Sequence, residues 1–590
     1  MPVYKFRNCL LNTLERLVIK DNECIELTTR TFDVLLYLIE NAGNVVSKDE
    51  ILGHVWSGNF VEESNLPVHI SKLRRLLGGK PGGRFIETVQ GVGYRFVAPV
   101  KNVAKTKWHE QLDLATVSRV NDKRGELAFE SIAILPFGNQ SSEKGFDYVA
   151  DGLTESLINR LSLVPGLRMI ARDTVFRYKS DTSNPAEIGG MLGVAAVLIG
   201  SINISDERFL LSVELVRVSD GAHIWRNKFE DSFSEIVRVQ EEITATVIER
   251  VRSSSVETAD DMTNYLGTRD AESYKAYLKG AYFLGKRTVP AVYKAISYFS
   301  DSVKYDSQNF YPLVKTVDCY RFLYIIDAIS HKTALKKLTP ILTRIPNGED
   351  ASDSVHLMYA ELHLQLYWDF KKAEEHVRRA LQLNPNCVHS TARYAEILAM
   401  TDRGEEALSQ IRRVLEIDPF SLVTYKRISR IFYGLGHYGS AIEFLNDALE
   451  LEPNDYEALA LMGGVLTELC DYKGALDLFR KSLEIQHTVD VLAMVGYVEG
   501  LRGRKSIARE IIREISSNSK AGSSYPLKLA RIYFVLGEKD TAYLLLNEAF
   551  ERREVELYGL LYDPRWKLVR HETRFLEAAR RVESLAGKRP

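Results

Sequence analysis

The 590-residue sequence predicts a multidomain protein: a small α+β domain, then an α/β domain, then an all-α helical solenoid. Three observations support this order. Residues 1–100 mix short alternating segments with helical ones, residues 129–252 alternate between strand-like and helix-like patterns, and residues 270–585 carry a 34-residue repeat. Polar stretches at 101–128 and 253–269 lack sustained apolar periodicity, so we expect both to be linkers.

Composition and charge narrow the class of protein. Apolar residues make up 45% of the chain, which is enough to bury several cores, and the net charge of -2 leaves any attraction to nucleic acid to a local patch. The five cysteines form no CxxC pair, which argues against a disulfide framework or a zinc site. With no signal peptide and no apolar run of about 18 residues, we expect a cytoplasmic protein that does not enter a membrane.

The first hundred residues read as short strands followed by three helices and a hairpin. Alternation around Leu17 and Ile25 indicates strands, and a helix is expected from about Thr29. Ser47 and Glu50 have the spacing of a capping box, which predicts the start of a second helix. A third helix is expected from about Ser64 to Gly78, with one apolar face that comprises Leu66, Ile70, Leu73 and Leu77.

The third helix is the candidate DNA reader. We expect its other side to carry Val68, His69, Ser71, Lys72 and Arg75. Between Ser64 and Ile86 there are five Lys or Arg residues and no acidic residue. A basic outer face on an apolar-backed helix suits a major groove, and the following glycine-tipped hairpin suits phosphate or the minor groove. The alternative is an ordinary surface helix and hairpin.

Residues 3–98 resemble the winged helix-turn-helix domain of OmpR/PhoB-type response regulators. The resemblance rests on VVSKDEILGHVW, VHISKLRRLLG and IETVQGVGYRF. It implies that Lys72 reads a base edge and that Val68 touches a thymine methyl. It also implies a set of phosphate-holding positions, namely Asn65, His69, Ser71, Arg74, Thr88 and Tyr94. Arg75 is added for its expected exposure and charge. Gln90 is included in the wing at a position where the family often has arginine, so the resemblance does not extend to minor-groove reading by an arginine there.

Two further expectations come from the same resemblance. In the family, the loop from Trp56 to about Glu63 contacts RNA polymerase, although Trp56 equally suits a packing role. The winged helix begins at residue 3, with no receiver domain before it in this sequence. We therefore expect that phosphorylation of a receiver aspartate is not the switch.

Residues 129–252 predict a compact α/β domain with the order βαβαβββα. The phrases AILPF, DGLTESLINRL, VLIGSI and DGAHIWRNKF resemble the domain found in TolB-like N-terminal regions. That domain also lies between an effector domain and tetratricopeptide repeats in some bacterial adenylate cyclases and regulators. At the level of architecture, the whole chain resembles the HilA-type invasion regulators, which are cytoplasmic transcriptional activators.

The repeat is the firmest internal pattern. Pro385, Pro419 and Pro453 are 34 residues apart, and each follows an alanine by 12 residues, at Ala373, Ala407 and Ala441. The alanines continue at Ala475, Ala508 and Ala542. Small residues allow two helices to approach closely, and proline marks a helix boundary. This is the pattern of a tetratricopeptide solenoid, with seven to nine repeats expected, and the alternative is a generic helical array.

Nothing in the sequence predicts catalysis. Asp147, Asp151 and Glu155 share a helical face, but a solvated face explains them better than a cation site. No GK[ST] follows the glycines near Gly189, and neither GxSxG nor HExxH is present. We therefore assign no catalytic residue, no cofactor and no metal.

The predicted function is that of a sequence-specific DNA-binding transcriptional regulator, read as an activator. The expected partners are double-stranded promoter DNA, RNA polymerase, a protein bound by the repeats, and a second copy of the chain. The alternative is an interaction scaffold whose winged helix binds protein rather than DNA. An enzyme, the third reading, would need a site that the sequence does not offer.

Overall fold

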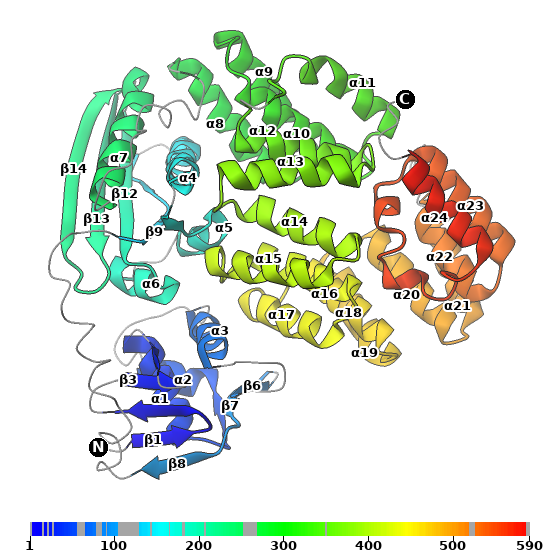
Figure 1. Ribbon diagram of the computed structural model, residues 1–590, viewed down its shortest axis with the longest axis horizontal. Coiled ribbons are helices and arrows are strands. Elements are labelled where there is room, and N and C mark those ends of the chain that lie inside the picture. The colour runs from blue at the N-terminus through cyan, green and yellow to red at the C-terminus, as the bar shows by residue number, and fades with distance from the viewer. Residues whose placement is uncertain are drawn as a thin grey trace.

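The computed structural model shows three domains that contact one another (Figure 1). It describes residues 3–13, 17–20, 23–25, 27, 29–55, 65–77, 85–89, 91–103, 129–141, 144–164, 166–179, 183–205, 208–251, 268, 270–348, 351–517 and 525–585. The linker predicted at 101–128 lies outside these ranges except for Lys101–Val103, and that at 253–269 except for Thr268. Within the described ranges, no helix combines the length and the apolar character needed to cross a bilayer.

The N-terminal domain opens with an antiparallel sheet. Its strands are β1 (Val3–Phe6), β2 (Cys9–Asn12), β3 (Leu17–Lys20), β4 (Glu23–Ile25) and β8 (Val100–Val103), in the order β4-β3-β2-β1-β8. Because Val3 pairs with Val103, the last strand ends three residues beyond the domain end expected at residue 100.

Three helices and a small sheet complete this domain. They are α1 (Thr29–Glu40), β5 (Val45–Ser47), α2 (Lys48–Val55), α3 (Asn65–Leu77), β6 (Ile86–Val89) and β7 (Gly93–Phe96). The capping box is confirmed, since the Ser47 amide donates to Glu50 at 2.7 Å and the Glu50 amide donates to Ser47 Oγ at 3.2 Å. A Cβ at Gly93 would lie 2.0 Å from the Val46 carbonyl oxygen, so only glycine lets β7 approach β5 this closely.

The central domain confirms the predicted α/β order, with short additions. Its main elements are β9 (Ser131–Ile134), β10 (Gly138–Asn139), α4 (Asp147–Ser162), β11 (Arg168–Met169), α5 (Arg172–Val175), α6 (Pro185–Leu192), β12 (Ala196–Ser205), β13 (Arg208–Arg217), β14 (His223–Ser232) and α7 (Ile236–Val251). The sheet runs β11-β9-β12-β13-β14, parallel up to β12 and antiparallel beyond it, and β10 pairs with β12. Its apolar core is continuous with Tyr274 and Leu278 of the first repeat helix.

The C-terminal domain is a solenoid of helix pairs, as the repeat predicted. The pairs are α8/α9 (Ala271–Gly285, Val289–Tyr305), α10/α11 (Tyr311–Ile325, His331–Leu342), α12/α13 (Asp353–Gln365, Phe370–Leu383), α14/α15 (Val388–Met400, Gly404–Ile417), α16/α17 (Leu422–Gly434, Tyr438–Leu451), α18/α19 (Tyr456–Glu468, Tyr472–Ile485), α20/α21 (Val489–Leu501, Lys505–Ser517) and α22/α23 (Pro526–Leu536, Lys539–Arg552), followed by α24 (Thr573–Leu585). The repeated small residues lie in the core: Ala373, Ala407, Ala441, Ala475, Ala508 and Ala542 are all fully buried.

The turns between repeats hold the central domain. Asn386 Nδ2 donates to the carbonyl oxygens of Ser162 and Leu167, at 3.0 and 2.8 Å. One repeat further along, Thr174 Oγ1 donates to the buried carboxylate of Asp418 at 2.5 Å. Asn386 directly follows the Asn384-Pro385 phrase, and Asp418 begins the Asp-Pro phrase of the next repeat boundary, so the turns that separate helices also dock the neighbouring domain (Figure 1).

The segment between α23 and α24 crosses the first helices of several pairs. Tyr324 of α10 donates to the Arg553 carbonyl, Tyr558 donates to Glu396 of α14 at 3.2 Å, and Tyr562 donates to the Ile431 carbonyl of α16 at 2.6 Å. Lys567 then donates to Glu468 of α18 at 2.6 Å. The chain therefore covers this face of its own solenoid.

Crowding at the repeat alanines gives a stability test. Ala407 is fully buried on α15, so Ala407→Leu forces extra methyl groups into a filled helix crossing and should destabilise the domain by about 1–3 kcal/mol. Ser409→Leu, on the exposed face of the same helix, should stay within about 0.5 kcal/mol of the parent. Denaturant unfolding followed by circular dichroism measures both, and equal midpoints would contradict the packing account.

A histidine cluster gives the solenoid a predicted pH dependence. His356 and His376 bring their Nδ1 atoms to 3.0 Å, and His363 stacks on His376 with ring centroids 5.5 Å apart. Burial, and next the charge of the neighbouring His376, lower the pKa of His356 from 6.5 to about 4. Because the folded state keeps this imidazole neutral, the unfolded chain binds protons first as the pH falls.

We therefore expect full stability above pH 6.5 and a loss of about 1–2 kcal/mol between that pH and pH 4, less than a fully buried shift would give because water screens part of the cluster. His356→Gln removes the main titrating group and should flatten this dependence. Thermal melts at half-unit pH steps measure it, and identical slopes for the parent and the variant would refute it.

Candidate nucleic-acid interface

Helix α3 has two distinct faces, as its sequence predicted. Leu66, Ile70, Leu73 and Leu77 are fully buried in the core of the winged domain. Ser71, Lys72, Arg74 and Arg75 point away from that core, toward the central and repeat domains. Four sequence-predicted site features lie outside the described residues: the side chains of Asn65 and Val68, and all of Trp56 and Gln90.

His69 lies on the inner side of α3 and not on the outer one. It is 1% exposed, and its Nδ1 lies 2.9 Å from the Thr31 hydroxyl of α1. Helical geometry explains the difference, because position 69 is three residues after Leu66 and four before Leu73, both of which face the core. In this conformation His69 therefore ties α3 to α1.

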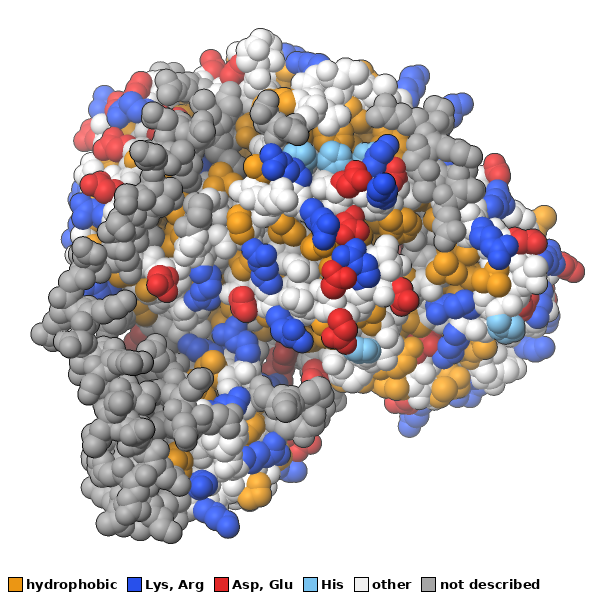
Figure 2. Space-filling model, in the orientation of Figure 1, with side chains coloured by type: hydrophobic (Ala, Val, Ile, Leu, Met, Phe, Trp, Pro, Cys, Tyr) orange, Lys and Arg blue, Asp and Glu red, His pale blue; other side chains and the backbone are white. Residues whose placement is uncertain are grey.

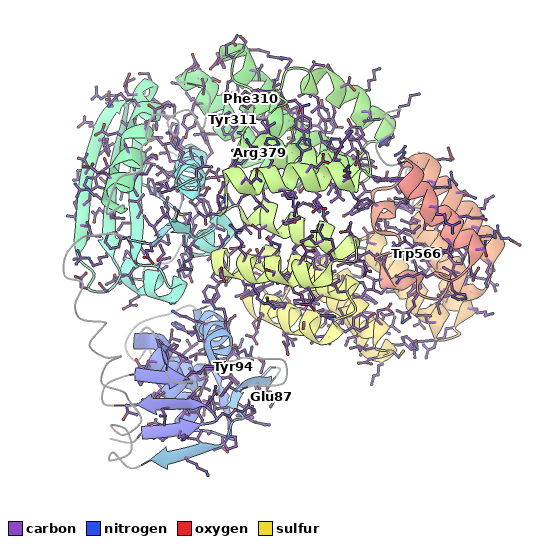
Figure 3. All side chains as sticks on the ribbon, in the orientation of Figure 1. Glu87, Tyr94, Phe310, Tyr311, Arg379 and Trp566 are labelled. Atoms are coloured by element: carbon purple, nitrogen blue, oxygen red, sulfur yellow. The ribbon has the colours of Figure 1, made fainter. Side chains whose placement is uncertain are left out.

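Arg74, Thr88 and Tyr94 come together where α3 meets the hairpin β6–β7. Arg74 Nε donates to the Ile86 carbonyl at 3.1 Å, and its Nη2 donates to Thr88 Oγ1 at 2.5 Å. The guanidinium carbon lies 6.0 Å from the centre of the Tyr94 ring, which is buried on β7 (Figure 3). Three residues predicted to hold phosphates thus form one cluster that joins helix to wing.

The outer face of α3 is occupied by the rest of the chain. Lys72 Nζ donates to the Gly190 carbonyl of α6 at 2.5 Å, and Ser71 Oγ lies 3.1 Å from the Tyr425 hydroxyl of α16. Arg75 reaches the Leu415 carbonyl at 3.5 Å, with its guanidinium carbon 5.5 Å from the centre of the Phe420 ring. Ser71 and Lys72 are consequently only 8% and 5% exposed.

Two carboxylates of α17 complete this contact. Arg74 Nη1 lies 3.0 Å from Glu450 Oε1 and 3.6 Å from Asp447 Oδ1, and Thr88 Oγ1 also donates to Glu450 Oε1. Burial, and next the charge of Glu450, raise the pKa of Asp447 to about 7, while Arg74 lowers it. The paired acids are thus held at some electrostatic cost beside the cationic face.

Sequence reasoning found the basic face but missed its partners. Gly190, Tyr425, Asp447 and Glu450 are more than a hundred residues away from α3 in the chain, and no local pattern links them to it. One signal existed, because Asp447 takes a repeat position at which neighbouring repeats carry a basic residue.

Comparison with known proteins divides the chain in the same way. Residues 21–96 match the family described as "Transcriptional regulatory protein, C terminal", and residues 128–246 match "HilA/YgeH-like transcriptional regulator, second domain". Residues 369–421 and 424–455 match tetratricopeptide repeats. The chain therefore carries an OmpR/PhoB-type winged helix, a HilA-like second domain and a tetratricopeptide solenoid.

Curated relatives resemble parts of the chain. The transcriptional regulator HilA of Salmonella typhimurium is 22% identical over 54% of this chain and 53% of its own length. A putative adenylate cyclase 3 of Rhizobium meliloti is 34% identical over 24% of each chain. The phosphate regulon regulatory protein PhoB of Shigella flexneri is 36% identical over 16% of this chain and 42% of its own. The chain thus spans between a quarter and about half of these relatives' lengths.

Among solved structures, the DNA-binding domain of Escherichia coli CadC is 26% identical, with 98% of that chain and 18% of this one covered, at a TM-score of 0.17. The DNA-binding domain of Klebsiella pneumoniae RstA, solved in complex with its RstA box, is 28% identical over 96% of that chain and 16% of this one, at a TM-score of 0.15.

The position of His69 gives a test of the domain's construction. His69→Ala removes a buried hydrogen bond and the packing of the imidazole, so the winged domain should lose about 1–3 kcal/mol of stability. Lys5→Ala, an exposed change on β1, should leave stability within about 0.5 kcal/mol. Amide hydrogen exchange of the α1 and α3 backbones reports the local change. Unaltered exchange in His69→Ala would show that this side chain does not join the two helices.

Proposed function

We propose that this protein is a sequence-specific transcriptional regulator whose winged helix reads double-stranded promoter DNA. The observation that carries the proposal is the division of α3 between a fully buried leucine and isoleucine face and a second face of Ser71, Lys72, Arg74 and Arg75. A helix built this way fits the major groove, where a lysine or arginine donates to guanine acceptors.

The wing supports the same function. The hairpin holds Thr88 beside Arg74, so phosphate donors from helix and wing converge on one point. Backbone contacts of this kind fix the register of a protein on the duplex, while base contacts supply the sequence preference. In this proposal Lys72 reads a base, and Arg74 and Thr88 hold phosphate.

The proposed function also includes RNA polymerase, a second copy of the chain and a signal as partners. The regulator acts in the cytoplasm as an activator, contacts RNA polymerase through the loop at Trp56, and binds its promoter as a pair of chains. The central and repeat domains receive the signal, through a protein or a small ligand, and no residue is assigned a catalytic step. HilA, which is 22% identical to this chain over 54% of its residues, is itself named a transcriptional regulator.

The scaffold alternative has one observation in its favour, because α3 contacts protein surfaces in this structure. Selection of bound fragments from random duplexes distinguishes the two functions. A DNA reader enriches a common motif, and its affinity falls about a thousandfold or more between 50 and 200 mM salt as phosphate contacts release counterions. A scaffold enriches no motif.

Lys72 gives the sharpest single test. Lys72→Ala should reduce the preference for the selected motif over a scrambled duplex by about 1–3 kcal/mol, because the alanine cannot donate to a base edge. The ratio of the two affinities is measured, since it does not depend on how readily α3 becomes accessible. Lys228→Ala, an exposed change on β14, is the control. A preference that survives Lys72→Ala would remove this residue from the reading role.

A further inference from the structure

We propose that α17 carries a built-in substitute for DNA, formed by Asp447 and Glu450, which holds α3 in an inactive state together with two carbonyl oxygens. This inference rests on the proposed function, because a DNA substitute has meaning only for a DNA reader. The surface of α17 is occupied by the chain's own winged helix. The closed arrangement in Figure 1 is then the form that does not bind promoters.

Glu450 accepts the hydrogen bonds that a DNA phosphate would accept in the proposed complex. Its Oε1 accepts from both Arg74 and Thr88, and these two residues are among those predicted to hold the DNA backbone. A carboxylate and a phosphate offer a guanidinium the same kind of acceptor, so the two compete for one donor pair. Glu450 Oε2 is buried with no hydrogen-bond partner, so its contact is incomplete and can be exchanged for a better one.

Two helix ends supply the remaining acceptors. The Gly190 carbonyl that binds Lys72 lies two residues before the end of α6, and the Leu415 carbonyl that faces Arg75 lies two residues before the end of α15. The last turn of a helix carries partial negative charge on carbonyls that are not fully used within the helix. Both ends therefore attract the cations of α3.

The charge at the repeat position of Asp447 differs from that in the adjacent repeats. The equivalent positions of three neighbouring repeats, 34 residues apart, carry Arg379, Arg413 and Lys481. The same position is acidic again in more distant repeats, at Asp301, Glu514 and Glu548, so Asp447 differs from its adjacent repeats and not from the whole series. The acid at Asp447 therefore reverses the charge of the adjacent repeats at the point where Arg74 approaches to 3.6 Å.

Repulsion between two arginines, Arg75 and Arg168, destabilises the docked position of α3. Arg168 of the central domain donates to the Glu416 carbonyl at 3.1 Å, and the charge of Arg75 contributes, after burial, to lowering the pKa of Arg168. Two guanidinium groups held near each other weaken the docked state. The contact is consequently suited to a reversible equilibrium between the closed form and an open form in which Ser71 and Lys72 can reach DNA.

The central experiment neutralises the substitute in the full chain. Asp447→Asn with Glu450→Gln keeps the side-chain shapes, and at pH 8, above the pKa of about 7 of Asp447, it removes both charges, so the open form gains population. Binding to the motif selected by the parent protein should become about tenfold tighter, and binding to a scrambled duplex should tighten by the same factor, because opening precedes both. The matched control is Asp477→Asn with Glu484→Gln on α19, which changes net charge equally at exposed positions away from α3.

A second readout needs no DNA. Lys72 is buried, so an amine-acetylating reagent should modify it slowly in the parent and several times faster in the double variant, while exposed Lys101 reacts alike in both. Mass spectrometry of tryptic peptides measures the rates, and a melting temperature matching that of the parent confirms folding.

The two proposals fail differently. If no duplex motif is selected yet Lys72 becomes accessible in the double variant, the docking is real and the DNA function is wrong. If a motif is bound but neither affinity nor acetylation changes in a folded double variant, the inference of a DNA substitute is overturned.

Discussion

The hydrogen-bond donors on the outer face of α3 can bind only one set of oxygen acceptors at a time. The docking of the winged domain on the other two domains depends on this constraint. Lys72 donates to the Gly190 carbonyl at the end of α6 in the central domain. Arg74 and Thr88 donate to the Glu450 carboxylate in the repeat domain. A desolvated lysine or arginine needs such acceptors, because an unpaired buried charge is costly. Any surface that displaces them has to offer equivalent oxygens, and the DNA backbone does so.

The acceptors are in place because the repeats position them. The repeats place α15 and α17 so that Leu415 and Glu450 both reach α3. The repeat-boundary turns at Asn386 and Asp418 dock the central domain, whose helix α6 contacts α3 through Gly190. Figure 2 shows basic and acidic side chains interspersed over the visible face of the repeats, so the fit to α3 comes from a few positions and not from one large field. The segment from Arg553 to Lys567 meanwhile covers the first helices, which fixes the solenoid against itself.

Most of the fold could be predicted, because it follows local rules. The repeat alanines, the capping box at Ser47 and the order of elements in the central domain are periodic or nearest-neighbour features, and each is confirmed. His69 shows the limit of judging a helix face by residue type, because its register places a polar side chain inward. The contacts of Lys72 and Arg74 were beyond reach, since they join segments more than a hundred residues apart and depend on how three domains dock.

Distance measurement between the winged domain and the solenoid tests this account most directly. Spin labels at Val92 on the wing and Glu484 on α19, both exposed, would report the separation by pulsed electron resonance once the other reactive cysteines are replaced. The account predicts one short, narrow distribution for the free chain and its replacement by longer distances when the selected duplex is added. An unchanged distribution with the duplex bound would show that α3 reads DNA without leaving α17. This result would contradict the claim that α17 and DNA compete for the same face of α3.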